Sequence, residues 1–208
     1  MSNLDMKKTF KHLYAPSKKD ITVVEVPSMH YLMIDGTGNP NTSPEYSESI
    51  PALYKLAYSI RAIKKSEGEV FTVMPLEGLW WFDGDPIENF ILTDVDKARF
   101  IWTLMILQPE SVTADIVAAA REEANKKKAV PTRLNDVRFE AYNEGEAVQI
   151  MHIGPYDEEG PTVKRLHAHI EDNGWSLSGK HHEIYLSDPR KVAPEKMKTV
   201  IRQPFTRR

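Results

Sequence analysis

Apolar positions in the first half of the chain predict three strands and one helix. β-Branched and apolar runs predict a strand over 21–36, kinked at Pro27, and two further strands over 71–84 and 98–109. Gly68 is a suitable end for the helix that lies between the first two of these strands. The apolar stripe that predicts this helix consists of Leu53, Leu56, Ala57, Ile60 and Ile63.

The second half repeats this order of elements. An alanine-rich segment over 111–128 predicts a helix between the two halves. Residues 136–154 then indicate a strand pair or one long bent strand, and 161–174 carry a helical apolar face. Two strands over 181–189 and 197–205 complete the pattern.

The repeated pattern predicts a single α+β domain spanning residues 1–208. Its two strand-helix-strand-strand repeats cover about 21–107 and about 136–205, and the helix at about 111–128 connects them. We expect the repeats to form a pseudo-twofold antiparallel sheet that buries a shared apolar surface and leaves a central ligand groove. The polar, lysine-rich stretch up to Asp20 is expected to pack on the surface as an arm.

Composition excludes several classes of function. The 208 residues contain no cysteine, which rules out disulfides, thiolate metal sites and cysteine nucleophiles. The net charge of -3 argues against a dominant electrostatic contact with nucleic acid or an acidic membrane. No apolar run has the length of a membrane span, and the first residues do not resemble a signal peptide, so a cytoplasmic location is expected.

Strong catalytic motifs are missing from the sequence. It contains no P-loop, no GxGxxG after a strand, no HExxH and no GxSxG. His181 and His182 are neighbours on a predicted strand and therefore point to opposite faces. His167 and His169 lie about 200° apart on a helix. Neither pair is suited to hold one metal ion, and we expect no metal and no cofactor.

Glu183 is the carboxylate that stands out. It lies within an otherwise apolar strand, where alternation places Glu183 and Tyr185 on one face and Ile184 and Leu186 on the other. If Ile184 and Leu186 face the helices, Glu183 and Tyr185 face the groove. The alternative is an ordinary solvent-exposed glutamate, as most strand carboxylates are.

Large aromatic side chains provide the second signal. Trp80 and Trp81 are adjacent and point to opposite faces, so one can fill the core while the other lines a groove. The alternative for each is core packing. Three further candidates for the ligand wall are Trp102, Tyr54 and Tyr156.

The ordered set of segments resembles the GyrI-like small-molecule-binding domain family. The resemblance covers about residues 5–205 and is closest to the stand-alone bacterial branch, with its N-terminal arm and double tryptophan. The segments that carry it are VPSMHYLMIDGTGNPN, ALYKLAY, MPLEGLWW, HIGPY and HHEIYLSDPRK.

The resemblance implies a ligand groove between two repeats and a role for the glutamate of the EIYL segment, which is Glu183 here. It also implies two activities: hydrolysis of planar, DNA-alkylating cyclopropanoid xenobiotics as a detoxification reaction, or binding and sensing of aromatic drugs without turnover. In the hydrolase hypothesis, Glu183 is the general base, and Tyr185 or Tyr156 donates to the carbonyl oxygen of the substrate. Glu77 is a second candidate carboxylate, which a bulge at Gly78 would aim into the groove.

A third hypothesis is a protein-interaction role such as gyrase inhibition, which the net negative charge of the chain permits. A transcription-factor role is disfavoured, because no helix-turn-helix segment precedes the fold. The expected partner is therefore a planar aromatic small molecule, with no nucleic acid and no membrane.

Overall fold

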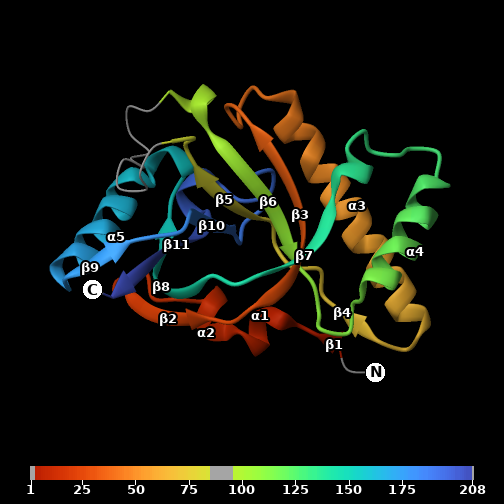
Figure 1. Cartoon of the computed structure of the whole chain (residues 1–208), viewed down its shortest axis with the longest axis horizontal. Helices are drawn as coiled ribbons and strands as arrows, with labels where there is room; N and C mark the ends of the chain where they lie inside the picture. Colours follow the sequence, from red (N-terminus) through yellow and green to blue (C-terminus); the bar gives the residue numbers. More distant parts are fainter. Residues whose placement is uncertain (1–2, 85–95, 208) are drawn as a thin grey trace.

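A nine-stranded antiparallel sheet forms the centre of the molecule (Figure 1). The computed structural model describes residues 3–84 and 96–207. Neighbouring strands follow the order β2-β8-β11-β10-β5-β6-β3-β7, and β9 pairs with β11. The strands are β2 (Thr22–Val26), β3 (Met29–Thr37), β5 (Glu77–Trp81), β6 (Ile101–Leu107), β7 (Arg138–Tyr142), β8 (Gly145–Ile153), β9 (Trp175–Leu177), β10 (His181–Tyr185) and β11 (Lys198–Arg207).

The two halves of the chain contribute equivalent sets of three strands, arranged in the same order from the outside of the sheet to its centre. The first half contributes β3-β6-β5 and the second β8-β11-β10, and the two sets meet where β5 pairs with β10. Helix α3 (Pro44–Ser66) lies between β3 and β5 in the sequence, and α5 (Gly160–Asp172) lies between β8 and β10. This arrangement confirms the predicted α+β class and its two strand-helix-strand-strand repeats.

Each half also supplies a strand to the other. The region predicted as one strand over 21–36 divides at Pro27, where the missing N–H interrupts the ladder. Strand β2 pairs with β8, whereas β3 pairs with β6 and β7. The segment 136–154 divides in the same way into β7 and β8, so the two bent strands pair along both of their arms.

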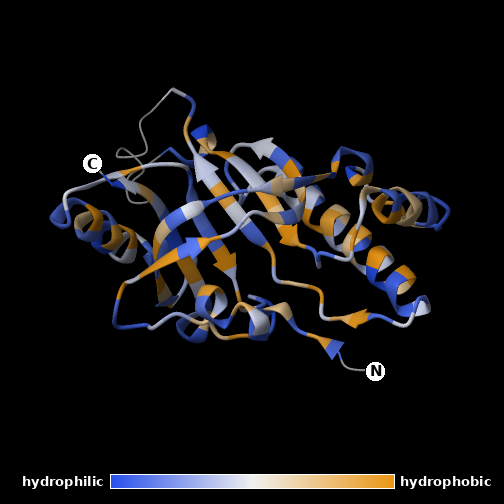
Figure 2. Ribbon diagram, turned by 60° about the horizontal axis from the view of Figure 1, so that its bottom comes forward, coloured by the Kyte–Doolittle hydropathy of each residue, from blue (hydrophilic) through white to orange (hydrophobic). Residues whose placement is uncertain are grey.

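The longer helices lie on one face of the sheet, and the short N-terminal helices lie against the opposite face. Helix α3 packs against β3 and β6, α5 packs against β8 and β11, and α4 packs on α3 (Figure 1). Apolar and polar stretches alternate along the helical ribbons, as expected of amphipathic helices (Figure 2). The helices are α1 (Met6–Thr9), α2 (Lys11–Tyr14), α3 (Pro44–Ser66), α4 (Ala114–Asn125) and α5 (Gly160–Asp172), and β1 (Asn3–Leu4) pairs with β4 (Val70–Phe71).

Helix α3 is longer than its apolar stripe predicts. Ser43 caps its N-terminus by accepting a hydrogen bond from the Tyr46 amide, and Pro44 follows at the first helical position. At the other end Gly68 has a left-handed φ of +91°, which suits a residue without Cβ.

The N-terminal arm is part of the core, which corrects the expectation of a surface arm. Met6, Leu13 and Tyr14 are at most 4% exposed and belong to the main apolar cluster. Their burial requires that α1 and α2 cover the sheet, because three such side chains would otherwise remain in water.

Candidate functional site

The register of β5, β10 and β11 places a polar cluster on one face of the sheet. Glu183 lies directly opposite Gly78, and His181 lies opposite Trp80. Tyr185 follows two residues after Glu183 and shares its face. Residues that are directly paired in an antiparallel sheet point to the same side, so these side chains converge at the junction of the two halves.

Glu183 is held by neighbours on this face and is only 7% exposed. The Tyr185 hydroxyl donates a hydrogen bond to its Oε2 at 2.7 Å, and His181 Nε2 lies 3.3 Å from its Oε1. Trp80 Nε1 donates in turn to the Tyr185 hydroxyl at 3.1 Å. Burial and the Glu183 charge raise the pKa of Tyr185 well above its ordinary value, so Tyr185 is a neutral donor near neutral pH.

A second carboxyl group, Glu159, adjoins Glu183. It precedes α5 and is 1% exposed. Burial and the nearby Glu183 charge raise the pKa of Glu159 well above its ordinary value. The raised pKa favours the protonated form of Glu159. The pair combines a carboxylate with a carboxylic acid in one buried place.

Aromatic rings from α3, β5, β10 and the turn before α5 lie around this pair. Tyr46 at the start of α3 lies 5.9 Å from Trp80 between ring centroids. Tyr156, in the turn before α5, meets the Tyr185 ring edge-on at 5.4 Å and is 37% exposed. Burial and the Glu159 and Glu183 charges raise the pKa of Tyr156 to about 12. The rings thus offer flat apolar surfaces beside two carboxyl groups.

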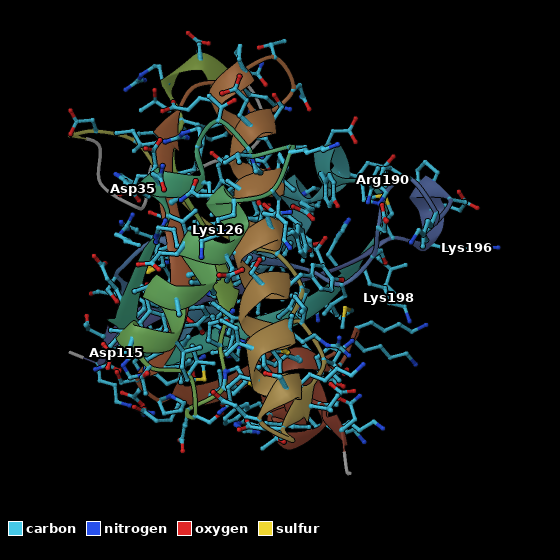
Figure 3. The ribbon with its side chains drawn as sticks, turned by 90° about the vertical axis from the view of Figure 1, so that its right-hand side faces the viewer. Asp35, Asp115, Lys126, Arg190, Lys196 and Lys198 are labelled. Atoms are coloured by element: carbon cyan, nitrogen blue, oxygen red, sulfur yellow. The ribbon has the colours of Figure 1, made fainter. Side chains whose placement is uncertain are left out.

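Tyr54 lies near the outer side of this cluster. It is half-buried and stacks on Tyr58 at a centroid distance of 6.3 Å. Burial raises the pKa of Tyr54, and the charges of Asp188 and Arg190 also act on it. Arg190 extends from the segment between β10 and β11 (Figure 3) and is tied to Asp188 by hydrogen bonds of 2.9 and 3.0 Å.

The structure corrects the predicted facing of β10. Glu183 and Tyr185 lie on the face that carries α3 and α5, since they interact with Tyr46 and Glu159 from those elements. Ile184 lies opposite Glu77 and therefore faces the N-terminal arm. The alternation along the strand is as predicted, but the site lies between the two helices rather than on the side away from them.

Of the other two predicted ligand-binding tryptophans, Trp81 lies on the opposite face, and Trp102 pairs with Trp80 but is fully buried. Trp81 points to the opposite face from Trp80, where the Lys180 Nζ lies 3.4 Å from its ring centroid. Trp102 is fully buried and covers Gly36, where a Cβ would lie 2.1 Å from the indole. Trp102 is therefore a core residue, and Trp80 is the indole beside Glu183.

Glu77 also lies away from the site, contrary to the expectation of a second groove carboxylate. It is fully buried on the opposite face, where it accepts a hydrogen bond from Tyr14 at 2.7 Å and lies 3.0 Å from His182 Nε2. The expected bulge at Gly78 is absent, because pairing continues without interruption through Gly78 and Glu77.

Glu77 belongs to a buried charge network behind the site. His182 Nδ1 lies 2.8 Å from Glu144 Oε1, and Arg202 Nη1 donates to Glu144 Oε2 at 2.9 Å. Burial alone would raise the pKa of Glu144, but His182 and Arg202 hold it at about 2. Burial opposes the charge on His182, but Glu144 and Glu77 raise its pKa to about 9.

Sequence reasoning missed Glu159 and Tyr46. Glu159 follows Asp157 and Glu158 in an acidic turn, and only the start of α5 at Gly160 distinguishes the buried member of the three. Tyr46 follows the capping Ser43 by three residues, which fixes its place in the first turn of α3. Among residues 3–84 and 96–207, no group of three or more His, Cys, Asp or Glu side chains is arranged to hold a metal ion.

A sheet of two matched halves, with α3 and α5 on one face and a carboxyl pair among aromatic rings between these two helices, defines a small-molecule-binding domain. The GyrI-like small molecule binding domain model matches residues 19–205, and the chain belongs to this family. No curated protein matches the chain.

Solved structures from Listeria innocua extend this similarity over the whole chain. An uncharacterized conserved protein is 40% identical with a TM-score of 0.89, and the match covers 98% of this chain and 100% of that one. A protein described as a hydrolase is 38% identical with a TM-score of 0.83 over 98% and 100% of the two chains. Another structure described as a hydrolase is 39% identical with a TM-score of 0.85 over 99% and 100%. Within the described residues, no helix combines the length and apolar character that crossing a membrane requires.

Proposed function

We propose that this protein is a hydrolase that opens the cyclopropane ring of planar, DNA-alkylating cyclopropanoid compounds, with Glu183 as general base. The observation that carries the proposal is the buried pair of Glu183 and Glu159, which offers a base and an acid side by side. The similarity to two structures described as hydrolases, at 38% and 39% identity, supports turnover over binding alone. Such a reaction would serve detoxification.

The proposed reaction adds one water molecule to the strained ring. Glu183 removes a proton as the water oxygen bonds to a ring carbon, and the adjacent carbon–carbon bond breaks. Its electron pair moves through the conjugated system to the carbonyl oxygen, where Glu159 delivers a proton and a phenol results. The proton on Glu183 then passes back to Glu159, which restores the starting state.

The surrounding residues have supporting roles in this proposal. The Tyr185 hydroxyl already donates a hydrogen bond to Glu183, so it positions the carboxylate rather than donating to the substrate. Tyr156, which is partly exposed beside both carboxyl groups, remains available as a donor. Trp80 and Tyr46 would stack on the flat body of the substrate.

The test is incubation of purified protein with a cyclopropanoid compound, followed by mass spectrometry. We expect a protein-dependent gain of one water. Glu183→Gln keeps the size and polarity of the side chain but removes the base, so kcat should fall by about 100-fold or more while ligand affinity survives. Glu158→Gln, which changes the exposed neighbour of Glu159, is the matched control and should retain turnover. Turnover near the wild-type rate in Glu183→Gln would rule out Glu183 as the base.

Binding of aromatic drugs without turnover is the second candidate function. The aromatic rings and carboxyl groups of the site are equally suited to hold a ligand. In that case tryptophan fluorescence would be quenched on titration with the compound, and its mass would not change. Trp80→Phe should weaken this quenching more than Trp81→Phe, since only Trp80 lies beside Glu183.

A further inference from the structure

A surface groove of about 560 Å³ lies on the face of the sheet opposite to the carboxyl pair. Ile153 of β8 and Lys198 of β11 are paired in register, and the amide of Leu186, just after β10, donates to the Lys198 carbonyl at 3.0 Å. Because side chains alternate along a strand, Ile153 points away from the face that His152 shares with Glu183. The three groove residues therefore form one row at the end of the sheet.

The floor of the groove begins where the cover of this face ends. In the preceding row, Ile184 and Val200 are fully buried in the main core cluster. The Ser17 carbonyl of the N-terminal arm accepts a hydrogen bond from the Met151 amide of β8 at 3.0 Å. Ile153 lies two residues further along β8 and is 41% exposed. The groove therefore leaves apolar surface in water, and covering that surface with an apolar ligand is favourable.

Two lysines give the rim of the groove a positive charge. Lys196 and Lys198 both line the groove and are exposed. Figure 3 shows both on the same side of the molecule. In the part of the chain that the structure describes, neither ammonium group forms an ion pair. Glu195 also lines the groove and opposes this charge only in part, because it is one carboxylate against two ammonium groups.

The other charges between β10 and β11 neutralise one another. Arg190 Nε donates to Asp188 Oδ1 at 2.9 Å, and Lys191 Nζ lies 3.7 Å from Asp188 Oδ2. The Asp188 carboxylate is therefore already paired and does not neutralise the two lysines of the rim. The groove combines an apolar floor with a surplus of positive charge at its edge.

We propose that this groove is a second binding site, which takes a small organic anion with an apolar body, such as an aromatic sulfonate or carboxylate. Its volume lies within the range of about 300–1,000 Å³ that is usual for small-molecule sites. The apolar body lies on Ile153, Leu186 and the half-buried Val192, and the anionic group meets Lys196 and Lys198. This site is separate from the carboxyl pair and does not rest on the proposed hydrolase activity.

The probe is 1-anilinonaphthalene-8-sulfonate, an aromatic sulfonate whose fluorescence rises in apolar surroundings. We expect saturable binding that weakens as salt is added, because salt screens the exposed lysines. N-phenyl-1-naphthylamine has the same rings without the sulfonate and is the matched neutral probe. Its affinity should not depend on salt or on the two lysines.

Charge variants test the rim of the groove. Lys196→Gln combined with Lys198→Gln should raise the Kd of the sulfonate about tenfold, because each exposed charge pair contributes a factor of a few. Glu195→Gln removes the opposing carboxylate and should lower that Kd by about two- to threefold. Lys127→Gln combined with Lys128→Gln removes two exposed lysines that follow α4 and is the matched control, which should bind like the wild type.

Ile153→Asp tests the floor of the groove and should abolish binding of the sulfonate, with circular dichroism as the check on folding. The proposal is wrong if the wild type does not bind the sulfonate or binds it without salt dependence. It is also wrong if the paired Lys196 and Lys198 variant or Ile153→Asp binds as tightly as the wild type, since the probe would then occupy another site. Should Ile153→Asp fail to fold, the paired lysine variant and Glu195→Gln decide.

Discussion

Gly78 shows how one absent side chain shapes the site. It lies opposite Glu183, and a Cβ there would lie 2.7 Å from Trp80 Nε1 and 2.9 Å from the Tyr185 hydroxyl. Contacts this short do not occur between real atoms, so the Trp80–Tyr185 hydrogen bond depends on glycine at this position. The sequence suggested a bulge, but Gly78 instead provides space.

We therefore predict that Gly78→Ala disturbs ligand binding more than folding. The added methyl group must displace the Trp80 indole or the Tyr185 hydroxyl, which loosens the hydrogen bond that orients Glu183. Affinity for a planar ligand should fall by about tenfold, corresponding to the loss of about one hydrogen bond. Fluorescence titration measures this, with Trp81→Phe on the opposite face as the control. An unchanged affinity would show that the Trp80–Tyr185 contact does not shape the site.

At the scale of elements, the buried network behind β10 joins the N-terminal arm to the strand that carries Glu183. Arg202 donates to the Leu13 carbonyl at 2.9 Å, and Gln149 donates to the His12 carbonyl at 2.6 Å. The family model begins at residue 19, so these contacts come from a segment outside the matched domain. The arm thus provides partners for polar groups that would otherwise be buried without them.

The network predicts a loss of stability at high pH. The pKa of His182 is raised to about 9 from an ordinary value of about 6.5, so its contribution is complete below about pH 6.5 and is lost as the pH rises through about 9. The shift corresponds to about 3 kcal/mol. Urea unfolding of the wild type and His182→Gln should therefore show a difference in unfolding free energy that narrows between about pH 7 and pH 10. A constant difference across that range would mean that His182 is neutral in the folded protein.

At the scale of the molecule, strand exchange makes the two halves interdependent. Strand β2 of the first half pairs with β8 of the second, and β7 of the second pairs with β3 of the first. The halves also meet through the β5–β10 ladder, where Glu183 lies opposite Gly78. The site is therefore complete only when both halves are folded together.

We predict that neither half folds alone. Division of the chain between Lys128 and Ala129 leaves each fragment without an edge strand and with unpaired ladders. Each fragment should show little native circular dichroism, whereas the two mixed fragments should recover it together with ligand binding. The intact chain should unfold in one transition by fluorescence and by circular dichroism. Independent folding of residues 1–128 would show that the repeats are separate domains.

The sequence by itself determined the elements, the two repeats and the strand position of Glu183, because strand and helix periods are local properties of the chain. Pairing of strands that are distant in the sequence decided which side chains meet in the site. Whether Trp80 or Trp81 lies beside Glu183, and which face of β10 the helices cover, depends on packing that alternation alone leaves open. For the same reason the sequence suggested Glu77 as a site residue and did not suggest Glu159, whereas the structure places Glu159 beside Glu183 and Glu77 on the opposite face. Burial of a charged side chain depends on which residues the fold brings against it.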